Sequence, residues 1–157
     1  MDRIYHWFRV PSIHIMTNEQ IGSLIYATAN ACGMPANMCR LIEAQSKHET
    51  DDYSSHAFHQ NNNCFGYKFV PGAKWQIGPG ITSSEKDPYA KYLSIENSVH
   101  EICDWIRRRQ TGNRFPSDLT TITTPLEYAT LLKSCGYYGD TIDHYTAGIT
   151  HFLNSSI

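Results

Sequence analysis

Residues 45–68 read QSKHETDDYSSHAFHQNNNCFGYK, and this stretch joins a helical pattern to a turn-rich segment. The helical pattern is predicted to cover residues 35–49, with Glu49 in its last turn. Because the helix face that is apolar earlier in the helix continues to Glu49, its carboxylate is expected to point inward. Four residues follow the spacing i, i+4, i+7 and i+11 of that face: Met38, Ile42, Gln45 and Glu49.

The residues before this helix predict another one at 18–32. Thr17 and Gln20 form a T-x-x-Q capping box, in which each side chain satisfies an orphan backbone donor. Apolar residues then recur at helical spacing until Gly33 and Pro35, which end one helix and begin the next.

The chain on either side of this helix pair predicts one domain over 1–157. Residues 1–16 form an aromatic extension whose Tyr5, Trp7 and Phe8 are expected to pack onto the body. Residues 51–93 lose helical spacing and are punctuated by glycine and proline, which indicates a loop and a small antiparallel sheet. Helical spacing then returns in three segments, so we predict a mainly α (α+β) fold with five helices around a β-containing insertion; the three segments are 95–112, 124–136 and 142–153.

The composition indicates a soluble globular protein, with 41% hydrophobic and 18% charged residues. The formal net charge of −2 gives no basic field for nucleic acid. No apolar run approaches the roughly 20 residues of a membrane span. The N-terminal residues contain Arg9, Pro11 and His14 and so lack a signal-peptide core. We therefore expect a monomer made in a cytoplasm, which another component delivers if its target lies outside.

The cysteines and histidines predict neither a metal site nor a cofactor. The five cysteines are odd in number and form no CxxC motif, so most are expected to be small buried residues. A single disulfide between Cys32 and Cys39 stays open. His48, His56 and His59 cluster in sequence, but they do not have the HExxH spacing of zinc ligands.

Glu49 has the predicted environment of a general acid. The negative end of the helix macrodipole and desolvation on an apolar face both favour the neutral acid, so its pKa should be raised. A raised pKa suits proton donation near neutral pH. The alternative is an ordinary glutamate at a helix end, turned to solvent.

The residues after Glu49 suit a turn that contacts a sugar. Asparagines at 61–63 favour turns, and their amides can also hold hydroxyl or acetamido groups. Phe65 supplies a ring, and Gly66 lets the backbone approach closely. Three aromatic residues further along are candidate stacking surfaces for sugar rings, or else they pack within the lobe: Trp75, Tyr89 and Tyr92.

These motifs together resemble the glucosaminidase domain of family 73 of the glycoside hydrolases. In that family a catalytic-glutamate segment is followed by an NNLFG[IM]K-like turn, and here Glu49-Thr50 precedes NNCFGYK at 62–68. CGYYGD at 135–140 is similar to the AGYATD segment of the family, which carries an active-site tyrosine. The resemblance extends over roughly residues 18 to 153.

The resemblance implies a lysozyme-like fold with a cleft between a helical body and a β-containing lobe. It implies hydrolysis of the β-1,4 bond after N-acetylglucosamine in peptidoglycan glycan strands, with Glu49 as the general acid. Tyr137 would line the reacting subsite, Phe65 and Gly66 would shape its floor, and Asn63 would contact the sugar. Delivery as a bacteriophage lysis or virion-associated enzyme, as a secreted effector or as an excised domain would suit this activity.

Two features depart from the family or stay open. Asp51 stands where the family usually has glycine, but aspartate tolerates the left-handed conformation. A second carboxylate should lie about 6.5–9.5 Å from the acid in an inverting enzyme and about 5–5.5 Å in a retaining one. Glu85 is our main candidate, with Asp87 and Glu96 as others, and the 2-acetamido group of the substrate can replace it.

Three alternative functions remain at the level of sequence. A muramidase would cleave the other glycosidic bond on the same fold. A wall-glycan-binding module would keep the fold without hydrolysis. A Cys–His hydrolase would use Cys64 as nucleophile and His100 as base.

Overall fold

In the computed structural model of the chain, residues 15–82 and 86–155 are described. Helix α1 (Asn18–Ala31) begins at the predicted capping box, where the Thr17 hydroxyl accepts from the Gln20 amide and the Gln20 side chain accepts from Thr17. Helix α2 (Ala36–Glu49) follows after a short turn through Gly33, whose φ is +85°. Both predicted helices are confirmed to within one residue at each end. The predicted packing of residues 1–14 lies outside the described residues.

The segment after α2 contains a short helix that the sequence pattern did not predict. Helix α3 (His56–Asn61) begins where the Ser55 hydroxyl accepts from the Phe58 amide, and it ends at Asn62, which is left-handed with φ 52°. Its six residues bury only Phe58 and Asn61. The helix therefore has no apolar stripe by which it could be recognised.

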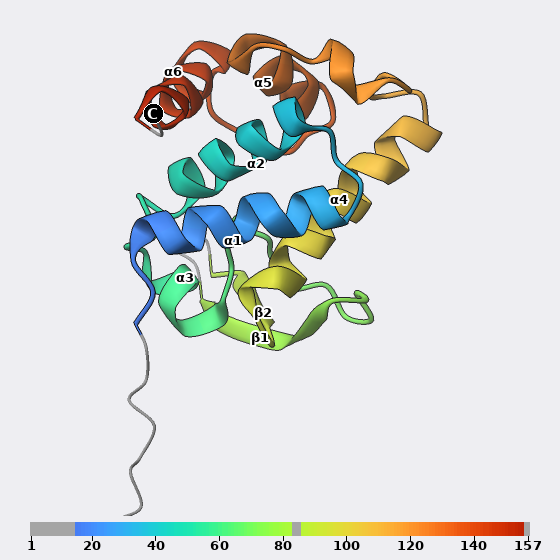
Figure 1. The fold of residues 1–157 in the computed structure, drawn as a ribbon. Coiled ribbons are helices and arrows are strands. Elements are labelled where there is room, and N and C mark those ends of the chain that lie inside the picture. The colour runs from blue at the N-terminus through green and yellow to red at the C-terminus, as the bar shows by residue number, and fades with distance from the viewer. Residues whose placement is uncertain (1–14, 83–85, 156–157) are drawn as a thin grey trace, which may run out of the picture.

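The predicted antiparallel sheet is confirmed. Strand β1 (Gln76–Thr82) pairs with β2 (Pro88–Tyr92), and Gln76 lies opposite Tyr92 at one end of the ladder. A bridge between Lys68 and Tyr89 ties the preceding loop to β2. The sheet and α3 lie together at the bottom of Figure 1 and form the lobe.

The other predicted helices complete the body. Helix α4 (Ile95–Thr111) packs on α1, and a 3-10 turn, η1 (Leu119–Thr121), leads to α5 (Pro125–Ser134). The Thr124–Glu127 capping box that opens α5 forms as predicted. Helix α6 (Ile142–Asn154) packs against both α2 and α5, so the C-terminal helices cover α2 opposite the lobe (Figure 1).

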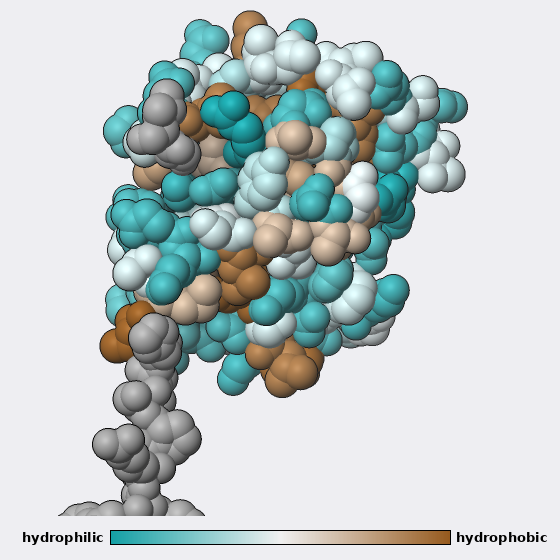
Figure 2. All heavy atoms as spheres, in the orientation of Figure 1, coloured by the Kyte–Doolittle hydropathy of each residue, from teal (hydrophilic) through white to brown (hydrophobic). Residues whose placement is uncertain are grey.

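One apolar core joins these helices. Its largest fully buried aliphatic side chains come from α1, α2, α4, α5 and α6, and they are Ile25, Met38, Ile42, Ile102, Ile106, Leu132 and Ile149. The face in Figure 2 is mostly polar, with apolar side chains in small groups. In the described ranges, no helix is both long and apolar enough for a membrane span.

Candidate active site

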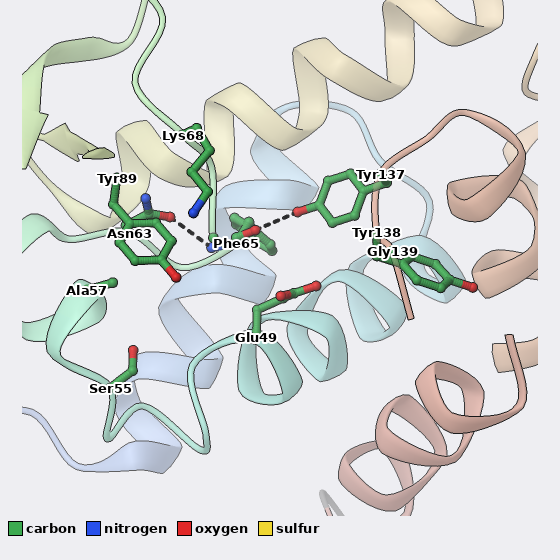
Figure 3. A pocket seen from close by; sticks show the side chains of 11 residues that line it. Glu49, Ser55, Ala57, Asn63, Phe65, Lys68, Tyr89, Tyr137, Tyr138 and Gly139 are labelled. Carbon is green, nitrogen blue, oxygen red and sulfur yellow. Dashed lines mark hydrogen bonds between the residues drawn. The ribbon is translucent and has the colours of Figure 1, made fainter. Parts of the chain in front are cut away.

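Glu49 is the last residue of α2, and its carboxyl lies in a cleft of about 370 Å³. Figure 3 shows that α2, the turn after α3, strand β2 and the loop before α6 all supply residues to this cleft. Burial raises the pKa of Glu49 to about 7, and a hydrogen bond from the Tyr145 hydroxyl partly opposes this rise. The predicted direction of the pKa shift is therefore confirmed.

A left-handed turn ends α2 directly after the carboxylate. Asp51 has φ 51°, as predicted for the position at which the family usually has glycine, and Asp52 and Tyr53 are also left-handed. Such residues cost roughly 1–2 kcal/mol each, so other contacts must hold them. The Tyr53 amide donates to the Thr50 hydroxyl at 2.9 Å, and the Tyr53 and Ser46 hydroxyls share a hydrogen bond of 2.9 Å.

Asn63 shapes the turn that faces Glu49. Its amide oxygen accepts from the backbone N–H groups of Phe65 and Tyr67, at 3.3 and 3.2 Å. Its amide nitrogen donates to the carbonyls of Tyr67 and Ala90, at 2.9 and 3.0 Å. With 1% of its surface exposed, the side chain is engaged inside the protein. Its predicted contact with a sugar stays a prediction.

Gly66 and Tyr137 lie beside the carboxylate. Gly66 has φ +70°, and a Cβ atom there would lie 3.5 Å from Oε2 of Glu49. The Tyr137 hydroxyl donates to the carbonyl of Phe65 at 2.8 Å, which ties the loop before α6 to the turn (Figure 3). The structure therefore brings five predicted site residues around one cleft: Glu49, Asn63, Phe65, Gly66 and Tyr137.

Two other predicted site residues face α4 and not this cleft. The Trp75 indole donates to Asp104 at 2.8 Å, and its ring stacks on His100 with centroids 4.6 Å apart. Tyr92 is buried, and its hydroxyl donates to Glu101. Tyr89 is the lobe aromatic that does line the cleft, beneath the ammonium group of a lysine that also lines it, Lys68.

The predicted second carboxylate, Glu85, lies outside the described residues. Asp87 and Glu96 do not line the cleft. Among the residues that the structure describes, Glu49 is the one carboxylate in the cleft lining. Glu85 therefore stays a prediction, beside the 2-acetamido group of the substrate.

The structure contradicts the Cys–His alternative. Cys64 is fully buried, and burial raises the pKa of its thiol to about 12, the opposite of an activated nucleophile. His100 instead contacts Cys32, whose sulfur lies 3.1 Å from Nδ1.

All five cysteines are free, so the disulfide considered between Cys32 and Cys39 is not formed. Within the described parts of the chain, no group of three histidine, cysteine or acidic residues could hold a metal ion.

Sequence reasoning missed several residues at the site. Tyr138 and Gly139 line the cleft, and Tyr145 contacts Glu49 from α6. Gln45 lies one turn before Glu49 and is completely buried. A glutamine on an otherwise apolar helix face was the available signal, since buried polar groups need partners.

The chain is similar to a known enzyme family. A family model for glucosaminidases, described as mannosyl-glycoprotein endo-beta-N-acetylglucosaminidase, matches residues 23–156. None of the curated protein sequences with which the chain was compared matches it significantly.

Three solved structures share its fold. The glycoside hydrolase domain of FlgJ from Salmonella typhimurium has 21% identity and a TM-score of 0.60, over 89% of this chain and 88% of that one. The catalytic domain of the autolysin Auto from Listeria monocytogenes has 20% identity and a TM-score of 0.57, over 90% and 86%. A type VI secretion system effector-immunity complex from Pseudomonas protegens contains a chain with 18% identity and a TM-score of 0.60, over 88% and 92%. The predicted lysozyme-like fold class is thus confirmed.

Proposed function

Because the chain belongs to the glucosaminidase family of glycoside hydrolases, we propose that it cleaves the β-1,4 bond after N-acetylglucosamine in peptidoglycan, with Glu49 as the general acid. The observation that carries the proposal is the partly buried Glu49 carboxyl in the cleft, with a pKa of about 7. An ordinary glutamate, with a pKa of 4.5, would have lost its proton at neutral pH. Glu49 keeps a large protonated fraction there, and so it can donate to a leaving oxygen.

The net reaction adds one water across the glycosidic bond. Glu49 gives its proton to the leaving oxygen as the bond to C1 breaks, C1 finally receives the hydroxyl group of water, and the other proton of that water returns the site to its starting protonation state. The second group in this scheme is either Glu85, which would take a proton from the water or attack C1 itself, or the 2-acetamido group of the substrate, which would attack C1. Both routes use Glu49 in the same way, and Glu85→Gln separates them because it stops only the first.

The cleft lining supports a glycan as the substrate. Its volume lies within the roughly 300–1,000 Å³ of small-ligand pockets, and it opens between body and lobe. The rings of Tyr89 and Tyr138 lie on it together with polar groups from Ser55 and Lys68. Aromatic faces beside hydrogen-bonding groups suit sugar rings, which have apolar faces and hydroxyl edges.

Mass spectrometry of fragments from purified peptidoglycan tests the proposal. Wild type should release reducing-end N-acetylglucosamine, whereas Glu49→Gln should release it at least about 100-fold more slowly. Reducing-end N-acetylmuramic acid would identify a muramidase, and wall binding without fragments would identify a binding module. A mannosyl-glycoprotein treated in parallel shows whether the chain acts there instead.

Delivery to the wall is part of the same proposal. A bacteriophage lysis or virion-associated role and a secreted-effector role both require the chain to act once it reaches peptidoglycan. Expression in a Gram-negative host with an added signal peptide should lyse the cells, and cytoplasmic expression should not. The Glu49→Gln variant, exported in the same way, is the control, and light scattering of the purified chain tests the predicted monomer.

A further inference from the structure

A chain of buried hydrogen bonds runs through the helical body to Glu49. The Tyr128 hydroxyl on α5 donates to Oε1 of Gln45 at 2.6 Å, and Nε2 of Gln45 donates to the Tyr145 hydroxyl at 3.4 Å. The Tyr145 hydroxyl on α6 then donates to Oε1 of Glu49 at 2.5 Å. Tyr128 and Gln45 have no exposed surface, and Tyr145 has 3%. This series of hydrogen bonds therefore joins α2, α5 and α6 inside the protein, away from solvent.

The direction of these bonds follows from the donors available. Within the described residues, Gln45 is the hydrogen-bond partner of the Tyr128 hydroxyl. The hydroxyl proton therefore points to the amide oxygen, which is an acceptor. The amide nitrogen of Gln45 then faces Tyr145 and can only donate to it. Since that hydroxyl already accepts from Gln45, its own proton is directed at Glu49. In this one direction, the hydroxyls of Tyr128 and Tyr145 and both amide atoms of Gln45 each have a hydrogen-bond partner.

The two oxygens of Glu49 consequently differ. Oε1 accepts a hydrogen bond from Tyr145. Oε2 is the oxygen near Gly66, since a Cβ atom added to that glycine would lie 3.5 Å from it. An oxygen that accepts a hydrogen bond is the better place for negative charge and the poorer place for a proton.

We propose that Tyr145 and Gln45 are positioning residues, which hold the Glu49 carboxyl so that its acidic proton sits on Oε2, beside Gly66 and the cleft. The use of that proton in catalysis rests on the proposed function, but its position does not. Tyr145 also stabilises the carboxylate, and this stabilisation limits how far burial raises the pKa of Glu49. The ring of Tyr145 is itself fixed, because it stacks on Tyr138 with centroids 3.8 Å apart and meets His48 edge-on at 4.7 Å.

The titration of Glu49 can be separated from the titrations of the neighbouring groups. His48 also titrates near the acid: burial lowers its pKa, as does His144, while Asp140 raises it. A His48→Gln variant, measured beside the wild type, identifies the part of the Glu49 titration curve that comes from His48. Burial raises the pKa of three nearby phenols, which stay neutral in this range: Tyr128, Tyr137 and Tyr138.

The test is a carbon-13 titration of the Glu49 carboxyl in protein labelled at the glutamate side-chain carboxyls, with the signal assigned by its loss in Glu49→Gln. Tyr145→Phe removes only the hydroxyl and keeps the ring contacts. The pKa of Glu49 should rise by about one unit, because a hydrogen bond to a charged group is lost. The basic limb of the pH profile of kcat/KM should shift to higher pH by the same amount.

Two further variants separate positioning from general destabilisation. Gln45→Met combined with Tyr128→Phe removes the two distal members without leaving a buried donor unpaired, and it should raise the pKa of Glu49 by less than Tyr145→Phe does. Tyr53→Phe is the matched control, since it also removes a buried tyrosine hydroxyl, the one bonded to Ser46, and should leave the pKa of Glu49 unchanged.

An unchanged pKa of Glu49 in Tyr145→Phe would overturn the proposal, even if the wild type cleaves peptidoglycan. A raised pKa in a protein that cleaves no glycan would support positioning and reject the proposed function. An atomic-resolution crystal structure at about pH 5, two units below the pKa of Glu49, tests the oxygen assignment. The Cδ–Oε2 bond should be the longer one, and a longer Cδ–Oε1 bond would overturn the assignment.

Discussion

Asn63 and Glu49 face the same cleft but are held in opposite ways. The Asn63 amide makes four hydrogen bonds to backbone groups, three within the turn and one, to Ala90, that joins the turn to β2. The Glu49 carboxyl accepts from Tyr145 on one oxygen, while the other lies beside a glycine. A polar group that is fully satisfied inside the protein shapes the fold, whereas one that is only partly satisfied keeps capacity for a ligand.

The largest expected effect is the loss of catalysis when Glu49, whose carboxyl is only partly satisfied by hydrogen bonds, is replaced. Glu49→Gln keeps the shape of the side chain but cannot donate an acidic proton, so kcat should fall by about 10² to 10⁴-fold. Release of reducing ends from peptidoglycan measures this loss. Glu43→Gln, on the same helix and paired with Lys47 in the wild type, should keep activity within about twofold. Equal losses in both variants would contradict the special role of Glu49.

Replacement of Asn63, whose amide is fully satisfied by hydrogen bonds, should mainly lower stability. Asn63→Ala leaves buried N–H and C=O groups without partners, so the free energy of unfolding should fall by at least about 2 kcal/mol. Urea denaturation measures it. Asn62→Gly is the comparison, because it removes one hydrogen bond, to Tyr92, and glycine suits the left-handed backbone there. A smaller loss for Asn63→Ala than for Asn62→Gly would break the contrast.

The pH dependence of stability should come from Glu49 and not from Asn63. Because the folded pKa of Glu49 is raised from an ordinary 4.5 to about 7, the folded chain binds more protons than the unfolded chain between these values. Its contribution to stability is therefore present below pH 4.5 and is lost as the pH rises to 7. The free energy of unfolding of Glu49→Gln, relative to wild type, should increase by about 3 kcal/mol across this window. Urea denaturation at pH 4.5 and pH 8 measures it, and equal differences at both values would exclude the shift.

The smallest expected effect concerns the space beside Oε2. Gly66→Ala should lower kcat/KM by about tenfold, because its methyl group would occupy the cleft beside the acid. It should also lower stability by about 1–2 kcal/mol, because φ is positive there. Gly72→Ala has the same backbone strain but no atom within 4 Å of the added Cβ, and it should keep full activity. If both variants lose activity equally, strain explains the effect.

Much of the scaffold could be predicted because its signals are local. Both capping boxes and the apolar faces of α1, α2, α4, α5 and α6 lie within single helices, and these predictions are confirmed. The left-handed conformation at Asp51 was expected from the family resemblance, since glycine is usual at that position and aspartate tolerates the same conformation. Helix α3 was missed because it depends on the Ser55 cap and a single buried ring, Phe58.

The aromatic residues show where such reasoning fails. Trp75, Tyr89 and Tyr92 were equal candidates for stacking on a sugar, since each has a suitable ring. Only the pairing of β1 with β2 and the packing of the lobe on α4 decide that Tyr89 lines the cleft. The same packing turns Trp75 to Asp104 and Tyr92 to Glu101.

The local pattern of α2 is thus enough to place a glutamate at a helix end on an inward face and to anticipate its raised pKa. Periodicity and burial act along one helix, so they can be read from adjacent residues. Which oxygen of Glu49 accepts and which faces the cleft depends on Tyr145, 96 residues away, and on Tyr128, which orients Gln45 from 83 residues away. The direction of these hydrogen bonds is set only in the folded core, because the donors and acceptors come from three different helices, α2, α5 and α6.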